Sequence, residues 1–232
     1  MEERVEALKR DIVLAKLALN DAWTHRLSVT ADHGKADSLP PPQTYDDFPR
    51  ESRDRGEVCY PREAKAIVEW AMKNKSEFKS HSFQQWFLSL TPDVMQKLQV
   101  PRFIMDIKER IMKREKLHGY EAEPALGDFI NILERGTQVQ MHQDRNYPPD
   151  RIHVRYNVHV QSGEGEDGLQ ICNDRVCLVP ERHYSRCLAG MEPHSSTEIC
   201  TNRARVGLSF GFLIPLPELD IFEFTPPIHF KG

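Results

Sequence analysis

Alternation of polar and apolar residues in the second half of the chain is the feature that most constrains its fold. From about residue 125 the pattern repeats every two residues, as in "RIHVRYNVHVQ" (151–161) and "RARVGLSFGFLIP" (203–215). A period of two places successive side chains on opposite faces of a β-strand. The further short runs "GLQICN", "RVCLVP" and "HYSRCLAG" are separated by turn residues. Short strands with regular turn signals predict an all-β sandwich or barrel.

The segment before this region has helical signals. Within residues 61–120, "PREAKAIVEWAMKNK" and "PDVMQKLQ" each begin with Pro, which the first helical position tolerates, and Thr91 can cap the second. "PRFIMDIKERIMKREKLHG" has an apolar face at helical spacing, and Gly119 is the expected stop. Three helices are therefore predicted. The aromatic residues expected in the core between helices and barrel are Trp70, Trp86 and Phe87.

Both ends of the chain differ from this central part. Residues 4–23 carry an apolar stripe at steps of three and four, which predicts an amphipathic helix docked on the chain's own body. A homodimer formed through this helix is the alternative. Residues 28–60 are Pro-rich, charged and aperiodic, which predicts either a linker or a lid. The expected organisation is a helix in 1–27, the loop or lid in 28–60, helices in 61–120, the β core in 121–217 and a tail in 218–232.

Charge and cysteine content exclude several classes of protein. The net charge is −4, with 31 basic and 35 acidic residues, so no nucleic-acid partner is expected. No apolar run approaches the ~20 residues that cross a bilayer, and the charged start of the chain is unlike a signal peptide, so no membrane association is expected. The five cysteines form no C-x-x-C pair. We interpret them as reduced thiols of a cytoplasmic protein, without a zinc site.

One group of polar residues in the β region suggests a metal site. His142 and Asp144 form a His-x-Asp triplet, but with 10 His and 35 acidic residues in 232 about 1.5 triplets of His, any residue and an acidic residue are expected by chance. Its neighbours are more informative: Gly136 marks the turn before the triplet, His194 follows roughly fifty residues later, and Arg205 begins the last strand. Two imidazoles and one carboxylate on one face of a metal, with open positions opposite, form the facial triad of non-haem Fe(II) oxygenases.

This pattern resembles the 2-oxoglutarate/Fe(II)-dependent oxygenases, in particular their aspartyl/asparaginyl β-hydroxylase-like and prolyl-hydroxylase-like branches. Their signature is an H-x-D, a later His, and an Arg or Lys on the last strand. The similarity covers about residues 129–215 and also includes "LERGTQVQMHQD", "HVRYNVHV" and "RVGLSFGFLIP". It implies an α+β fold, in which an α-helical N-terminal part packs on a double-stranded β-helix, a jelly-roll or cupin-like barrel.

The resemblance also implies roles for individual residues. His142, Asp144 and His194 would bind Fe(II). Arg205 would hold the C5 carboxylate of the cosubstrate 2-oxoglutarate, because a guanidinium group matches a carboxylate with two parallel hydrogen bonds. Arg203 shares a predicted strand face with Arg205 and is therefore a rival for this role.

Three other polar residues are expected at the cosubstrate or substrate. Ser209 is the expected second donor on the last strand, and Arg155 and Asn157 share a face of the strand 151–161. The chain departs from the prolyl-hydroxylase-like pattern at Leu133, where many members have a cosubstrate-binding Tyr. The histidines expected to be structural or on the surface are His153, His159 and His183.

The implied activity is that of a dioxygenase. It would use O₂ to oxidise, and most simply to hydroxylate, a C–H bond of an amino acid, peptide or small metabolite, while 2-oxoglutarate is decarboxylated to succinate. Desaturation or ring formation at the same iron site is one alternative, and a non-catalytic cupin-like binding barrel is another. The carboxylate of Asp144 argues against a halogenase. The lack of Glu in "RNYPPDR" (145–151) argues against a cupin-type metal enzyme.

Overall fold

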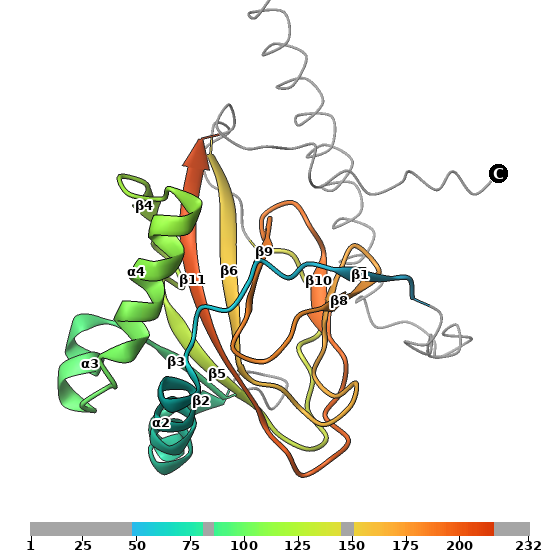
Figure 1. Ribbon diagram of the computed structural model, residues 1–232, viewed down its shortest axis with the longest axis horizontal. Coiled ribbons are helices and arrows are strands. Elements are labelled where there is room, and N and C mark those ends of the chain that lie inside the picture. The colour runs from blue at the N-terminus through green and yellow to red at the C-terminus, as the bar shows by residue number, and fades with distance from the viewer. Residues whose placement is uncertain (1–47, 81–85, 145–150, 216–232) are drawn as a thin grey trace, which may run out of the picture.

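The computed structural model describes residues 48–80, 86–144 and 151–215, which form two β-sheets and a group of helices (Figure 1). The helices are α2 (Pro61–Lys73), α3 (Pro92–Lys97) and α4 (Phe103–Glu115), with a 3₁₀ turn, η2 (Lys75–Glu77). The strands are β1 (Arg50–Ser52), β2 (Lys79–Ser80), β3 (Trp86–Ser89), β4 (Glu121–Ala122), β5 (Phe129–Leu133), β6 (Arg151–Gln161), β7 (Gln170–Cys172), β8 (Arg175–Leu178), β9 (Tyr184–Cys187), β10 (His194–Ser196) and β11 (Arg205–Pro215). Within these ranges, no helix combines the length and apolarity needed to cross a lipid bilayer.

The larger sheet separates an apolar face from a polar one. Its strand order is β2-β3-β5-β11-β6-β9, and β4 pairs with β11 in addition. Strands β6 and β11 are antiparallel throughout, with a register shift between Val206 and Gly207. Their even-numbered residues, 152–160 and 206–214, are apolar and belong to the main core. The alternation places the following odd-numbered residues on the opposite face: His153, Arg155, Asn157, His159, Arg205, Gly207, Ser209 and Gly211.

Helices α2 and α4 cover the apolar face of this sheet (Figure 1). Each buries a stripe at helical spacing, including Ile67 of α2 and Ile104, Ile107 and Ile111 of α4, all fully buried. Complete burial of one such side chain contributes ~1.5–3 kcal/mol relative to its exposure. The helices therefore bury the apolar face of the sheet, and the polar face remains free to face the second sheet.

The smaller sheet lies opposite that polar face. Its order is β1-β8-β7-β10, with β1 parallel to β8 and the other pairs antiparallel. A small cluster of buried residues includes Cys172 and Cys177 of this sheet and Cys187 of the larger one. This cluster joins the two sheets, and polar residues occupy the space between them beside it. The predicted β core, preceded by helices, is confirmed.

Some boundaries differ from those predicted. Residues 50–52, within the expected loop or lid, form β1, because they pair with the free edge of β8. Strands β2 and β3 lie within the region expected to be helical, and β3 pairs with β5. The predicted N-terminal helix, residues 28–47 of the expected loop or lid, and the 218–232 tail lie outside the described residues.

The end of α4 also differs from the prediction. The helix stops at Lys116, which adopts a left-handed conformation with φ 56°, rather than at Gly119. The reason is Leu117, which is fully buried and whose N–H donates to the carbonyl of Met112. Because the helix ends before Leu117, the side chain of this leucine can point into the core. Gly119 lies in the turn that follows.

Candidate metal centre

His142 and His194 are neighbours across an irregular strand pair. Residues 137–144 are extended rather than a regular strand, and they pair with the segment that begins at β10. The N–H of His142 donates to the carbonyl of His194 at 3.0 Å, and the N–H of His194 returns a bond to His142 at 2.8 Å. The ring centroids consequently lie 4.3 Å apart. The backbone thus brings together two residues that are distant in the sequence.

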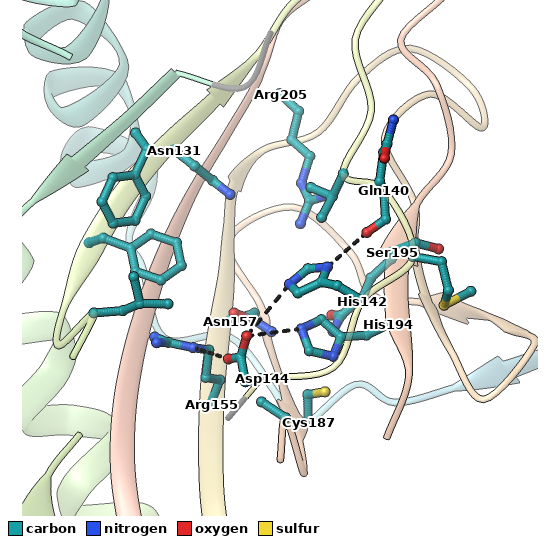
Figure 2. A pocket seen from close by; sticks show the side chains of 17 residues that line it. Asn131, Gln140, His142, Asp144, Arg155, Asn157, Cys187, His194, Ser195 and Arg205 are labelled. Carbon is teal, nitrogen blue, oxygen red and sulfur yellow. Dashed lines mark hydrogen bonds and ion pairs between the residues drawn. The ribbon is translucent and has the colours of Figure 1, made fainter. Parts of the chain in front are cut away.

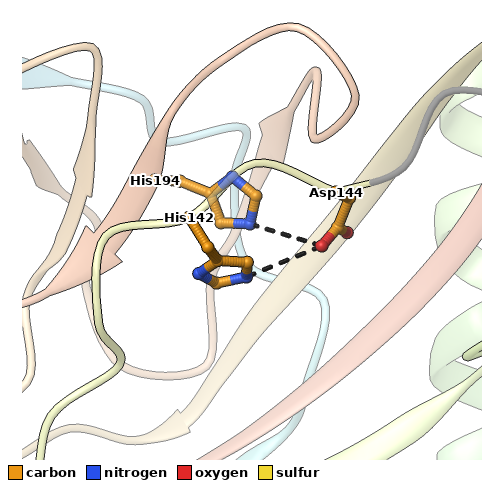
Figure 3. A group of neighbouring side chains, drawn as sticks. All are labelled: His142, Asp144 and His194. Atoms are coloured by element: carbon orange, nitrogen blue, oxygen red, sulfur yellow. Dashed lines mark ion pairs between the residues drawn. The ribbon is translucent and has the colours of Figure 1, made fainter. Parts of the chain in front are cut away.

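Asp144 completes a compact group with the two histidines (Figure 3). Its Oδ1 lies 3.6 Å from Nε2 of His142 and 4.0 Å from Nε2 of His194. The three candidate ligand atoms all lie within 4.8 Å of one another. Two imidazoles and one carboxylate on one side of a common point fit the facial triad in donor type and number.

The orientation of both rings suits metal binding. Nδ1 of His142 lies 2.7 Å from the carbonyl oxygen of Gln140, and Nδ1 of His194 lies 2.8 Å from that of Glu192. A carbonyl oxygen only accepts, so each Nδ1 carries a hydrogen, and the neutral form of either ring would have its lone pair on Nε2. Both Nε2 atoms face Asp144 (Figure 3). A backbone carbonyl that fixes the tautomer in this way is typical of metal-binding histidines.

The surroundings of His142 and Asp144 favour the protonation states in which these side chains can bind a cation. Desolvation, followed by the charge of His194, lowers the pKa of His142 and favours its neutral form. For Asp144, burial acts to raise the pKa, but His194, Arg155 and His153 outweigh it and the net direction is down. The carboxylate is therefore ionised at neutral pH while His142 is neutral.

Arg205 lies in the same pocket, and among the described residues it has no carboxylate partner. It is 7% exposed, and its Nη1 donates to the carbonyl of Gly168 at 2.8 Å. Its Nε has no partner, and no acidic side chain of the described residues pairs with it. Burial lowers the pKa of Arg205 to about 10. A buried cation without an anion is costly, so this guanidinium is suited to an anionic ligand.

Arg203, the rival for the same role, lies elsewhere. It precedes β11, is about half exposed, and pairs with Glu181 at the surface. The strand begins only at Arg205, so the alternation expected to extend to Arg203 does not. Of these two arginines, only Arg205 lines the pocket.

The other expected contact residues divide into two groups. Asn157 lines the pocket. Arg155 also lines it, but each of its nitrogens is bonded to protein, with Asp144 among the acceptors. The hydroxyl of Ser209 lies 3.4 Å from Nη1 of Arg155.

His159 was not singled out for the cosubstrate, yet it lies beside Arg205. It is 2% exposed, and its Nε2 has no hydrogen-bond partner. Burial, and then the charge of Arg205, lower the pKa of His159 to about 3, so the ring is neutral. The signal that could have identified it is the alternation that places it on the same face as Arg155 and Asn157.

The pocket around these groups has a cavity volume of about 330 Å³ (Figure 2). Its apolar lining includes Leu126 and Met141, both partly exposed, and Phe129, whose ring centroid lies 4.7 Å from that of Phe87. Phe87 was expected in the core between helices and barrel; instead, the position of β3 next to β5 places it in the pocket wall. A polar interior with an apolar rim can admit an organic ligand beside a metal.

A second group, Cys172, Cys187 and Glu192, also lies within 4.8 Å. Both oxygens of Glu192 already accept hydrogen bonds, from Asn173, from Arg53 and from the N–H of Leu188. The Cys172 and Cys187 pKa values are raised. We therefore assign this group to the core that joins the sheets.

Many solved structures are similar to this chain. One is a prolyl-4-hydroxylase from Pseudomonas putida, with a TM-score of 0.50 and 15% identity, covering 70% of this chain and 91% of that chain. Another is HygX from Streptomyces hygroscopicus with nickel and 2-oxoglutarate bound, with a TM-score of 0.50 and 10% identity, covering 75% and 87%. No family model and no curated protein match the sequence. At these identities the likeness concerns the fold, and the predicted double-stranded β-helix is confirmed.

Proposed function

We propose that this chain is a non-haem Fe(II) and 2-oxoglutarate-dependent dioxygenase. One observation carries the proposal: a group of two histidines and one carboxylate opens into the same pocket as a buried arginine that has no carboxylate partner among the described residues. The first feature suits a divalent metal with open positions, and the second suits a dicarboxylate that binds beside that metal. Either feature alone has many explanations; both together in one pocket favour this class.

Each residue then has a defined task. His142, Asp144 and His194 would hold Fe(II), and Arg205 would bind the far carboxylate of 2-oxoglutarate. When bound, the iron and 2-oxoglutarate supply the oxidation with O₂, and the protein orients the substrate and limits access of water. A substrate enters past the apolar rim and Asn157, and we propose an amino acid, peptide or small metabolite hydroxylated at a C–H bond.

The first test is binding, because it needs no knowledge of the substrate. Wild-type protein loaded with Mn(II) should bind 2-oxoglutarate in calorimetry, and the metal-free protein should bind it far more weakly. His142→Ala and Asp144→Ala should lose Mn(II) binding but keep the wild-type circular dichroism spectrum. If both variants retain stoichiometric metal, these residues are not the ligands.

The second test is turnover. Amino acids, peptides and small metabolites would be screened with Fe(II) and O₂ for substrate-stimulated conversion of 2-oxoglutarate to succinate. Gain of one oxygen atom by a substrate supports hydroxylation, whereas loss of two hydrogens indicates desaturation or ring formation. Tight binding of metal and 2-oxoglutarate with no succinate under any condition would favour a binding barrel.

A further inference from the structure

The two oxygens of Asp144 have different surroundings (Figure 2). Oδ1 faces the two histidines, as described above. Oδ2 accepts a hydrogen bond from Nε of Arg155 at 2.9 Å and lies 3.4 Å from Nδ1 of His153. A carboxylate that rotates freely can offer one or both oxygens to a metal. Here Oδ2 already accepts a hydrogen bond from Arg155, on the side of the carboxylate that faces away from His142 and His194.

Arg155 is held on all sides by the protein. It is 3% exposed, and besides Asp144 its Nη1 donates to the carbonyl of Gly127 at 3.1 Å, while its Nη2 donates to Oε2 of Glu123 at 3.2 Å. The ring of Phe129 covers one face of the guanidinium, with 4.8 Å between Cζ and the ring centroid. A guanidinium fixed in this way presents its Nε–H to Asp144 in one orientation.

Glu123 is in turn anchored by backbone. Its carboxylate accepts hydrogen bonds from the N–H groups of Ala125, Leu126 and Gly127 at 2.7, 2.8 and 3.0 Å. It is 2% exposed, so its charge is compensated by these amides and by Arg155. The resulting chain of contacts runs from the loop after β4 through Glu123 and Arg155 to the outer oxygen of Asp144.

Gly211 makes room for this chain of contacts. A Cβ on Gly211 would lie 2.9 Å from Cβ of Glu123, 3.2 Å from Nη1 of Arg155 and 3.3 Å from Nε2 of His153. The middle of β11 therefore accommodates the Glu123–Arg155 pair only because this position lacks a side chain.

We propose that Arg155 and Glu123 are a positioning pair, which holds Asp144 so that Oδ1 alone faces the metal. This inference rests on the proposed metal site. A carboxylate that binds through one oxygen leaves more coordination positions open, and the cosubstrate and O₂ both need such positions. Removal of the pair would free Oδ2 to approach the metal. This role replaces the cosubstrate contact expected of Arg155.

The decisive variant is Glu123→Gln, which removes the charge of a residue that does not touch the metal group. Its matched control is Glu63→Gln in α2, because Glu63 is also buried, accepts from the N–H of Tyr60 at 2.9 Å and pairs with Arg110 at 2.5 Å. We expect Co(II) to bind Glu123→Gln ~10–100-fold more weakly than wild type, with an altered ligand-field spectrum. Glu63→Gln should keep the wild-type affinity and spectrum.

Arg155→Met and Arg155→Lys provide a second route if Glu123→Gln does not fold. The methionine variant should lose affinity, and the lysine variant, which restores one charged donor, should recover part of it. Wild-type affinity and spectrum in the folded variants of both residues would overturn the inference, provided that Asp144→Ala abolishes Co(II) binding. Failure of wild-type protein to bind Co(II) would instead overturn the proposed metal site.

Discussion

At the scale of single residues, the local environment separates two arginines that the sequence pattern leaves equivalent. Arg205 is buried in the pocket, whereas Arg203 is at the surface with Glu181 as its partner. An exposed ion pair is worth ~0–1 kcal/mol because water and salt screen it. A buried guanidinium opposite a ligand carboxylate is screened far less.

We therefore expect different results from the two alanine variants. Arg205→Ala should weaken the binding of 2-oxoglutarate to the Mn(II)-loaded protein by ~2–5 kcal/mol, since one partner of a buried charge pair is lost. Arg203→Ala serves as the control and should bind almost as wild type. Calorimetry measures both, and a larger effect at Arg203 would refute the assignment.

His159 provides a prediction about acid stability. Its pKa is about 3 in the folded protein and near 6.5 when exposed, so between these two pH values the unfolded chain binds up to one proton more. The free energy of unfolding should therefore fall as the pH falls, by ~1.4 kcal/mol per pH unit from this residue alone.

Urea unfolding of the metal-free protein between about pH 7 and pH 4 tests this expectation. In His159→Gln the free energy of unfolding should depend less steeply on pH, by the equivalent of about one bound proton. His153, whose pKa is lowered to about 4, remains in the variant and retains its own contribution. Equal slopes for wild type and His159→Gln would refute the buried neutral state.

At the scale of elements, the loop between β6 and β7 supports Arg205. Gly168 has φ 68°, and its carbonyl accepts the bond from Arg205. A Cβ at this position would lie 2.7 Å from Cδ1 of Ile199 and 3.0 Å from Cδ of Arg205. The glycine therefore provides both the left-handed backbone and the space that the guanidinium stem needs.

Gly168→Ala should combine two effects. The left-handed backbone alone should cost ~1–3 kcal/mol in the free energy of unfolding, and the contact with Arg205 should also weaken 2-oxoglutarate binding. Gly165→Ala is a matched control, because its φ is 63° and a Cβ there meets nothing within 4 Å. Thermal melts should show a loss for both variants, and calorimetry a loss of binding only for Gly168→Ala. Unchanged binding in that variant would contradict the role of the loop.

At the scale of the whole molecule, four of the five cysteines are buried in the core. Cys59, Cys172, Cys177 and Cys187 are fully buried, whereas Cys200 is exposed. Burial also raises the pKa of Cys59 to about 12, which leaves little thiolate to react.

A thiol reagent should therefore detect one fast cysteine in the native protein and four more after unfolding. Cys200→Ser should abolish the fast phase without changing the total released by denaturant. A second fast thiol in the native state would show that one of the buried clusters that contain cysteine opens readily.

The sequence by itself determined most strands of the β core, the three helices apart from the end of α4, and the candidate ligands. Strand alternation and helical spacing are local properties, so β6 was predicted at its observed bounds, 151–161. The chemistry of His142, Asp144 and His194 is equally a property of residue type. Only the tertiary structure decided which arginine enters the pocket, that Arg155 faces Asp144, and that residues 50–52 join a sheet. Each of these depends on contacts between segments far apart in the chain, and a local pattern contains no information about such contacts.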